Sequence, residues 1–397
     1  MSRIITILTG PIVGLNSTEF INNTINFAEK LGIKIQLFNL FDEMVELSGE
    51  KYSNAYDYME CTGQILDGYQ YQFQLLRENA YRSIARKIDK LPKNINIAIR
   101  TPACIEWRGY NNILKDHKII AEVIRPNRIV TLIDAEWKIK ERLNTDYGKH
   151  VLKLIAHQKD LTIEKILQWL GTEVSVSEDW AEWIKFINNK PVKHLVLGIS
   201  TPSVKNRKIY TQDVENLTKI LTQPKIISFY ASYSMTVASE KARKIINEAI
   251  WKLREYGVVI DPASIEIGGN IKKEEESVVF AYTVCRDLRW DVQKVDIVSA
   301  FHPYKYNPKR NEFPPLSTGM MDELGHARAF RKERYLVLTA GGESPFTKDN
   351  YVPAEHIYKT TNEFFDFVEN KRVKKLKPQY KKITNAFKQW QRKQKKK

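Results

Sequence analysis

Short runs of β-forming residues alternate with longer segments of helical character along the first half of the chain. This alternation restricts the fold more than any other feature of the sequence. It favours a parallel sheet whose two faces are covered by helices. The predicted strands are Ile4–Thr9, Lys34–Leu40, Asn96–Arg100, Arg128–Asp134 and Lys193–Ile199.

The rhythm breaks between residues 200 and 224, where the polar stretch STPSVKNRK and the sequence TQPK flank a modest helical segment. A second, shorter alternation follows, so we predict an α/β protein of two domains. The first domain covers residues 1–200, a linker covers 201–224, and a smaller α/β domain covers 225–370. The predicted strands of the second domain are 225–231, 258–260, 295–300 and 334–339, and its predicted helices are 239–256, 274–293, 321–331 and 355–369.

The basic character of the chain is concentrated in its last segment, residues 371–397. The formal net charge is +16, but this segment carries 13 Lys and Arg and no acid, which leaves +3 for the rest. Its apolar residues recur at helical spacing, so we predict an amphipathic helix that begins near Pro378. Three interpretations stay open: a helix that packs on its own domain, a helix that contacts nucleic acid (RNA more readily than DNA), and a helix on an anionic membrane surface. The apolar residues are Leu376, Tyr380, Ile383, Phe387 and Trp390.

Composition is typical of a globular, soluble protein. The chain is 43% hydrophobic and 28% charged, and no window approaches the ~18 consecutive apolar residues of a membrane span. Its three cysteines are scattered, and they form neither a disulfide framework nor a metal motif. The first residues lack a signal-peptide pattern. We therefore expect a cytoplasmic protein without a metal or a cofactor.

A loop with some features of a phosphate-binding loop, TGPIVGLNST, follows the first predicted strand. A Walker loop needs glycines for a tight turn, a lysine for the terminal phosphates and a Ser or Thr for Mg²⁺. Gly10 and Ser17 stand in their places and Thr18 lies beside them, but Asn16 stands where the lysine should be. These residues are the candidates for nucleotide binding in the first domain.

With the motifs RTPACIEWRG (100–109) and RPNRIVTLIDAEWKIKERL (125–143), this loop resembles the adenylate-kinase-like P-loop family over residues 1–200. The resemblance implies a P-loop-kinase-like parallel sheet. Because Asn16 cannot supply the charge that stabilises a transferring phosphoryl group, we expect a domain that has lost phosphotransfer. Two roles stay open for it: nucleotide binding without transfer, and a scaffold or dimerisation role.

Four short motifs in the second domain follow one another in a meaningful order. FYASYS (229–234) ends the first strand, CRDLRW (285–290) lies on a helix, QKVDIVSAF (293–301) contains a buried strand, and STGMMDELGHARAF (317–330) begins a helix. Together they resemble the nucleoside 2-deoxyribosyltransferase family and its branch of nucleoside 5′-monophosphate N-glycosidases. The resemblance covers about 225–345, and it implies a flavodoxin-like domain that cleaves N-glycosidic bonds.

Carried over residue by residue, the resemblance gives Glu323 the role of the nucleophile and Asp287 that of the acid near the departing base. A carboxylate beneath the anomeric carbon can add covalently or stabilise positive charge on the sugar, and a proton donor assists departure of the base. Ser317 matches a serine that helps to hold the 5′-phosphate. We expect the helix N-terminus to keep Glu323 ionised.

Further residues are expected to line the same pocket. Ser232 would contribute its hydroxyl group and nearby backbone amides, and Asp296 would order the site without reacting. Gly319 and Phe229 are expected beside the substrate. The family's site borrows a residue from a neighbouring subunit, and Ser344 is the candidate for that role, so we expect a homo-oligomer.

Each of the main candidates also has a purely structural interpretation. Glu323 can be a first-turn acid that offsets the helix dipole, worth up to ~1 kcal/mol. Asp287 can form a surface pair with its neighbouring arginines, and Ser317 can cap the helix. His326, three residues after Glu323, is expected to be structural.

The sequence as a whole favours an enzyme that acts on a nucleotide or nucleoside. The expected activity is that of an N-glycosidase or a base-exchanging 2-deoxyribosyltransferase. The main alternative is an inactive nucleotide-sensing or RNA-associated binding protein. An NAD-cleaving hydrolase and a P-loop nucleotide kinase are further alternatives. The retained Glu323, Asp287 and Ser317 favour the enzyme over the binding protein.

Overall fold

The computed structural model divides the chain into two compact units. Unit 1 comprises Met1–Pro224 and Ile265–Tyr282, and unit 2 comprises Lys225–Ser264 and Thr283–Lys397. Each unit contains one five-stranded sheet in which every pairing is parallel, so the predicted α/β class is confirmed. The structure describes residues 3–11, 17–49, 70–107, 110–145, 148–149, 161–199, 210–234, 239–264, 273–305, 314–341, 346–371 and 377–394.

The sheet of unit 1 has the strand order β2-β3-β1-β6-β7. Each strand predicted for this half of the chain forms within one residue of its expected ends. Strand β6 is buried at every position, as a parallel sheet covered on both faces requires. The strands are β1 (Ile5–Thr9), β2 (Ile35–Asn39), β3 (Asn96–Arg100), β6 (Arg128–Ile133) and β7 (Lys193–Gly198).

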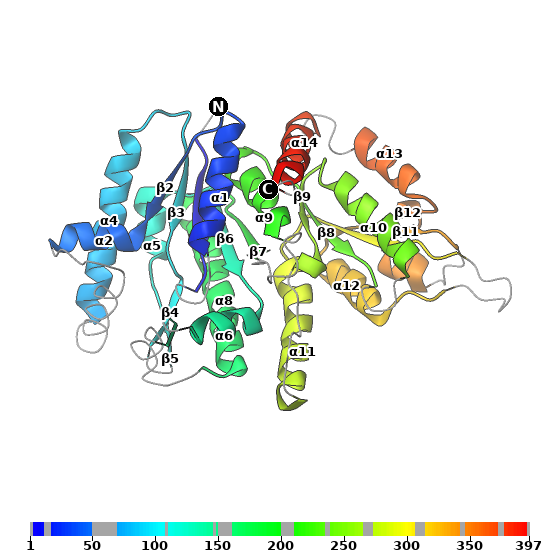
Figure 1. Cartoon of the computed structure of the whole chain (residues 1–397), viewed down its shortest axis with the longest axis horizontal. Helices are drawn as coiled ribbons and strands as arrows, with labels where there is room; N and C mark the ends of the chain where they lie inside the picture. Colours follow the sequence, from blue (N-terminus) through cyan, green and yellow to red (C-terminus); the bar gives the residue numbers. More distant parts are fainter. Residues whose placement is uncertain are drawn as a thin grey trace. The chain divides into compact units, whose positions relative to one another are not determined.

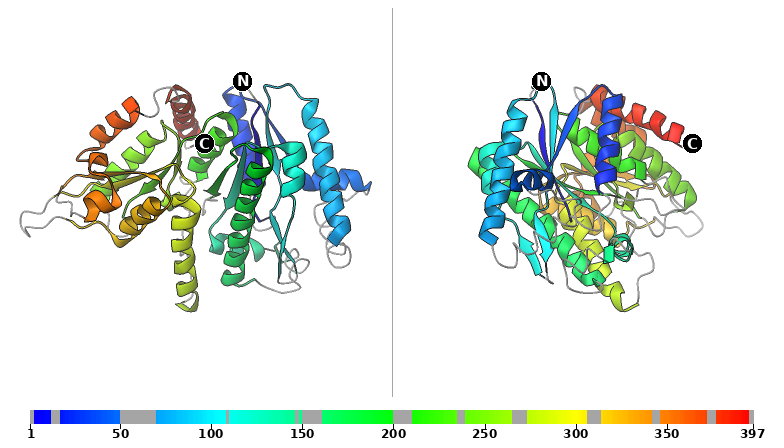
Figure 2. Two further views of the ribbon diagram at one scale, coloured as in Figure 1. Left: turned by 180° about the vertical axis from the view of Figure 1, so that it is seen from behind. Right: turned by 60° about the vertical axis from the view of Figure 1, so that its left-hand side comes forward.

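Helices cover both faces of this sheet. Helices α1 and α9 pack against each other, and the long helix α8 lies on the opposite face (Figures 1 and 2). A separate antiparallel hairpin, β4 (Cys104–Trp107) and β5 (Tyr110–Ile113), follows β3. The helices are α1 (Ser17–Lys30), α2 (Leu40–Ser48), α4 (Gln70–Asp89), α5 (His117–Ile119), η1 (Ile120–Ile124), α6 (Glu136–Leu143), α8 (Ile163–Asn188) and α9 (Tyr210–Thr222).

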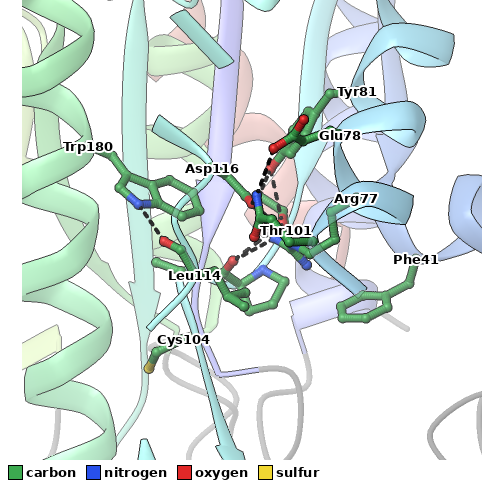
Figure 3. A network of polar contacts seen from close by, with 12 residues as sticks. Phe41, Arg77, Glu78, Tyr81, Thr101, Cys104, Leu114, Asp116 and Trp180 are labelled. Carbon is green, nitrogen blue, oxygen red and sulfur yellow. Dashed lines mark hydrogen bonds and ion pairs between the residues drawn. The ribbon is translucent and has the colours of Figure 1, made fainter. Parts of the chain in front are cut away.

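A buried ion pair fastens α4 to the start of α5 and to the loop after β3 (Figure 3). Arg77 and Asp116 are both fully buried, and Arg77 Nε donates to Asp116 Oδ2 at 3.0 Å. Tyr81 Oη donates to the same oxygen at 3.0 Å, and Arg77 Nη2 donates to Thr101 Oγ1 at 2.9 Å. Removal of one partner of a buried pair costs about 3–5 kcal/mol, so this network anchors unit 1.

The sheet of unit 2 has the strand order β12-β11-β10-β8-β9. Its first strand, β8, lies between the second and the third, which is the order of flavodoxin-like doubly wound sheets. The strands are β8 (Ser228–Ser232), β9 (Val258–Ile260), β10 (Ile297–His302), β11 (Glu333–Leu338) and β12 (Ile357–Tyr358).

The apolar core of unit 2 lies between its sheet and two helices. Phe229 and Ala231 of β8 pack with apolar residues of α10 and α13, and α12 and η4 pack together on the other face (Figure 1). The helical segments are α10 (Glu240–Leu253), η2 (Pro262–Ser264), η4 (Arg286–Val292), α12 (Thr318–Ala329), η5 (Phe346–Tyr351), η6 (Ala354–His356), α13 (Thr361–Lys371) and α14 (Lys377–Gln394). Segments η3 (Lys273–Glu275) and α11 (Glu276–Cys285) lie at the return from unit 1.

Three parts of the chain depart from the predicted organisation. Residues 210–222 of the expected linker form α9, because its apolar face, with Val214 and Leu217, is fully buried in unit 1. The segment 265–282 also belongs to unit 1. The predicted helix 355–369 begins later, since its first residues form η6 and the short strand β12.

The basic C-terminal segment forms α14, which packs on unit 2 (red in Figure 1). Tyr380, Ile383 and Phe387 are buried, and they recur at the predicted helical spacing. Tyr380 Oη donates to the carbonyl oxygen of Lys225 at 2.7 Å and accepts from the amide of Ile227 at 3.2 Å. The apolar face of α14 therefore fits the first of the three interpretations of this segment, a helix that packs on its own domain.

Phe387→Ala tests this docking. The side chain of Phe387 is completely buried, so its removal should lower the free energy of unfolding of unit 2 by about 3–5 kcal/mol. Asn385→Ala on the exposed face of α14 is the matched control, and its effect should stay within ~0.5 kcal/mol. Urea unfolding followed by circular dichroism measures both, and equal effects would contradict the docked position of α14.

Candidate functional site

The carboxyl ends of β8 and β10 meet at one edge of the sheet of unit 2. The chain leaves β8 toward β9 on one side, whereas β10 pairs with β8 on the other. This reversal is a topological switch point, the place where doubly wound folds bind ligands. Strand β8 ends at Ser232 and β10 ends at His302. A ligand site in unit 2 is therefore expected beside these two residues.

Helix α12 directs Glu323 toward this edge. Met320, Leu324 and Ala327 are buried at helical spacing, which turns that face of the helix toward the sheet. Glu323 lies on the same face and is only 9% exposed. It belongs to the second turn of the helix, since the first turn contains no acid. The interpretation of Glu323 as a first-turn acid that offsets the helix dipole is therefore wrong.

Two hydroxyl groups of β8 hold the carboxylate of Glu323. Tyr230 Oη donates to Oε1 at 2.7 Å, and Ser232 Oγ donates to Oε2. Both donors are fully buried. Together they fix the orientation of the carboxyl group and leave further lone pairs on its two oxygens.

Two further carboxyl groups lie on η4, the segment that packs against α12. Arg286 Nη2 contacts Asp287 Oδ1 at 2.6 Å, and Arg286 Nε lies 3.8 Å from Asp291 Oδ2. The Arg286 and Asp291 side chains are each 5% exposed and the Asp287 side chain is 14% exposed. The interpretation of Asp287 as a surface pair is therefore wrong, because the pair is largely buried. The π-helical turn that carries these residues is a feature found often at functional sites.

Burial raises the pKa of all three carboxyl groups. For Glu323 it raises the pKa to about 7; the hydroxyls of Ser232 and Tyr230 oppose this shift, and nearby Asp287 adds to it. Burial also raises the pKa of Asp291 well above its usual range, and that of Asp287 above its usual value, in both cases against the lowering effect of Arg286. Because Asp287 and Asp291 share the charge of one guanidinium, that of Arg286, its attraction only partly offsets the effect of burial on their pKa.

The expectation that the helix N-terminus keeps Glu323 ionised is therefore wrong. Glu323 lies in the second turn of α12, inside the helix and away from its first turn, where the dipole acts most strongly. Desolvation outweighs the two hydrogen bonds from β8. Near pH 7, Glu323 exists in comparable amounts as the acid and as the carboxylate.

Strand alternation separates the predicted residues of β8 onto two faces. Successive side chains of a strand point to opposite faces, so Tyr230 and Ser232 share a face, while Phe229 and Ala231 share the other. Phe229 packs in the apolar core with α10 and α13. It is a core residue on the face opposite Glu323. Tyr230 was missed from the sequence, although its two-residue separation from Ser232 was a usable signal.

Asp296 lies at the opposite edge of the sheet. It precedes β10, and its Oδ2 accepts hydrogen bonds from Ser228 N at 2.8 Å and Ser228 Oγ at 2.9 Å. Ser228 begins β8 and Ser232 ends it, a separation of about 13 Å along the strand. The prediction that Asp296 orders the substrate site is therefore corrected: it orders the starts of β8 and β10.

Two predicted residues lie at the start of α12. Ser317 is the N-cap, and its Oγ accepts a hydrogen bond from Met320 N at 3.3 Å. Gly319 is exposed, and a Cβ atom there would meet no neighbouring atom, so packing does not require glycine. Ser344 lies outside the residues that the structure describes. The imidazole of His326 lies against the ring of Phe330 at 4.7 Å, which suits the structural role expected of it.

Gly10 and Thr18, the described candidates at the two ends of the N-terminal loop, form hydrogen bonds within unit 1. The amide of Gly10 donates to Glu173 Oε1 at 2.7 Å, and Thr18 Oγ1 accepts from Arg100 Nη1 at 2.6 Å. Ser17 begins α1 and is buried, and Asn16 lies outside the described residues. Arg100 thus brings a positive charge to the start of α1 from the end of β3.

Neither a metal cluster nor a membrane span is found in the described part of the chain. There, no group of three or more His, Cys, Asp or Glu side chains is arranged to hold a metal ion. Within the same residues, no helix combines the length and apolar character needed to cross a bilayer.

Among the comparisons with known proteins, those with solved structures give matches. No family model and no curated protein matches the sequence. Among solved structures, shikimate kinase from Acinetobacter baumannii in complex with shikimate aligns over 56% of this chain and 96% of its own. The identity is 11% and the TM-score is 0.29, so the similarity carries no inference about activity.

The raised pKa of Glu323 predicts a pH-dependent stability. Its pKa is about 7 in the folded state against 4.5 in the unfolded state, so the folded state retains the proton between these values. The resulting stability is fully present below pH 4.5 and is lost as the pH rises through 7. The difference corresponds to about 3 kcal/mol. Glu323→Gln should therefore gain about that amount relative to wild type between pH 4.5 and pH 8.

Urea unfolding of both proteins at several pH values measures this difference. Glu248→Gln, a substitution of an exposed glutamate on α10, controls for the loss of one carboxyl group. A stability difference between Glu323→Gln and wild type that stays constant from acid to alkaline pH would contradict the burial of an ionisable Glu323.

Proposed function

We propose that unit 2 cleaves the N-glycosidic bond of a nucleotide or nucleoside, with Glu323 as the nucleophile. The observation that carries this proposal is the carboxyl group of Glu323, which is buried at the switch point and oriented by Tyr230 and Ser232. A second acid, Asp287, lies on the adjacent segment η4 with its pKa raised. A nucleophile and a proton donor on neighbouring elements are what glycosidic cleavage requires.

In the proposed reaction, a carboxylate oxygen of Glu323 forms a bond to the anomeric carbon of the sugar. The bond from that carbon to the base nitrogen breaks, and its electron pair leaves with the base. The base accepts a proton from the carboxyl group of Asp287, and burial, which raises the pKa of this group, favours its protonated form. Water then attacks the anomeric carbon, its proton passes to the Asp287 carboxylate, and the ester bond to Glu323 breaks, which restores both residues; attack of a second base at the same carbon would complete a transfer instead.

The hydroxyl groups of Tyr230 and Ser232 support the first step in two ways. They orient the carboxylate before substrate binds, which reduces the entropy lost on reaching the reactive geometry. They also stabilise the charged form of Glu323 in a buried place, where desolvation otherwise favours the acid. The pKa of Tyr230 is itself raised well above its usual value by burial, so its hydroxyl stays a donor.

Inactive nucleotide sensing is the alternative with a specific observation in its favour. Arg100 contacts Thr18 at the start of α1 in unit 1, where a helix N-terminus and a cation together suit an anion. Phosphotransfer stays disfavoured, because Asn16 replaces the lysine of the Walker loop.

Release of free base tests the proposal directly. The full chain is incubated with ribo- and deoxyribonucleosides, their 5′-monophosphates and NAD, and the products are separated by chromatography. Wild type should release base from at least one substrate, and Glu323→Gln should release none. Asp287→Asn should be about 10²–10⁴-fold slower, the usual contribution of a general acid.

Glu248→Gln again serves as the matched control and should keep wild-type activity. Release from NAD alone would assign the hydrolase alternative. If no substrate loses its base while nucleotides still raise the melting temperature, the protein is a binding protein and the proposed reaction is wrong.

Self-association is the second part of the proposal. Trp183, Phe186 and Ile187 of α8 are 52, 78 and 43% exposed, and the ring of Trp183 lies 5.6 Å from that of His117. Exposed apolar patches of this kind mark protein interfaces.

Analytical sedimentation of wild type should show a dimer or a larger assembly, and Phe186→Glu should shift the equilibrium toward the monomer. Lys90→Glu, on an exposed part of unit 1, is the control; a wild-type monomer at high concentration would contradict the proposal.

A further inference from the structure

Helix α14 presents its charged residues to solvent in a fixed direction. Three contacts set its rotation on unit 2: the buried ring of Phe387, the hydrogen bonds of Tyr380 Oη to the backbone at Lys225 and Ile227, and the bond from Thr384 Oγ1 to the carbonyl of Arg254 at 3.2 Å. Because these contacts hold its apolar face, α14 cannot rotate that face toward another surface unless it dissociates from unit 2.

The outward side of α14 and the segment before β8, which Tyr380 contacts at Lys225, carry a set of cations that we call the basic face. Across the described part of the chain, only Lys388 of this set forms an ion pair, at 3.4 Å from Glu255 Oε1. The others are exposed. The basic face consists of Lys225, Lys381, Lys382, Lys388, Arg392 and Lys393.

Two tryptophan rings lie among these cations. Trp390 is half-buried and stacks on Phe387 with ring centroids 5.6 Å apart. Trp251 of α10 is also half-buried, and the ammonium group of Lys388 lies 5.5 Å from its ring. Aromatic rings between cations are the combination that binds unpaired bases together with their phosphates.

We propose that the basic face binds single-stranded RNA. From Lys381 to Arg392, α14 spans about 16 Å, which matches several successive phosphates of one strand. Unpaired bases, which RNA presents in loops and at its ends, can stack on the half-buried tryptophans. This proposal is independent of the glycosidase reaction, because it involves no residue of the Glu323 site.

A membrane surface fits the same charges less well. An amphipathic helix binds a bilayer by burying its apolar face among the lipids. The apolar face of α14 is already buried against unit 2. Undocking would therefore expose Tyr380, Ile383 and Phe387 before any of them could reach a lipid.

Fluorescence anisotropy with a labelled single-stranded RNA of mixed sequence tests the proposal on the full chain. Lys381→Glu/Lys382→Glu should weaken binding at least tenfold. The slope of log K against log salt concentration should fall in magnitude by about 1.4, since each phosphate contact contributes about 0.7. Both lysines are exposed, so circular dichroism and the melting temperature should stay close to wild type.

Lys241→Glu/Lys244→Glu is the matched control, because it makes the same change of charge on exposed lysines of α10. Its affinity should stay within about twofold of wild type. An equal loss in both variants would show non-specific attraction to net charge and would overturn the proposal. So would tighter binding to single-stranded DNA of the same sequence, or to vesicles that contain phosphatidylserine, than to the RNA.

Discussion

Parallel pairing of β8 with β10 is the constraint on which the candidate site depends. Parallel strands end at the same edge, so the segments that follow them begin close together. Tyr230 and Ser232 arrive at that edge on one face of β8, and α12 brings Glu323 to them from about ninety positions later in the chain. No local sequence pattern specifies this meeting, because it follows from the topology of the sheet.

Burial then decides the chemistry of the residues that meet there. An isolated carboxylate in such a place would be costly, and the structure reduces the cost with hydroxyl donors for Glu323 and one guanidinium shared by Asp287 and Asp291. The compensation is incomplete, so the pKa of Glu323 rises to about 7. The ionised form of Glu323, which can act as a nucleophile, and its protonated form therefore differ little in free energy near pH 7.

The sequence predicted the elements better than the contacts between them. All strands of the first sheet were placed correctly, because each is a short run rich in β-forming residues between longer segments of helical character. Glu323 was found through its motif, yet Tyr230 was missed and Asp296 was assigned to the wrong edge. Period-two alternation could have supplied Tyr230. The pairing of Asp296 with Ser228 could not be read from the sequence, since it requires the register between two strands far apart in the chain.

Comparison of two buried carboxylates explains why unit 2 is the stronger candidate for chemistry. Glu173 in unit 1 accepts hydrogen bonds from three backbone amides, those of Gly10, Ala103 and Cys104. Backbone amides of packed loops cannot rotate away, so this carboxylate is committed to joining two loops of its own unit. Glu323 is held by side-chain hydroxyls instead, and these can reorient or accept a hydrogen bond in return. A carboxylate with adaptable partners can form a bond to a ligand and then regain its contacts, which is what a covalent nucleophile must do.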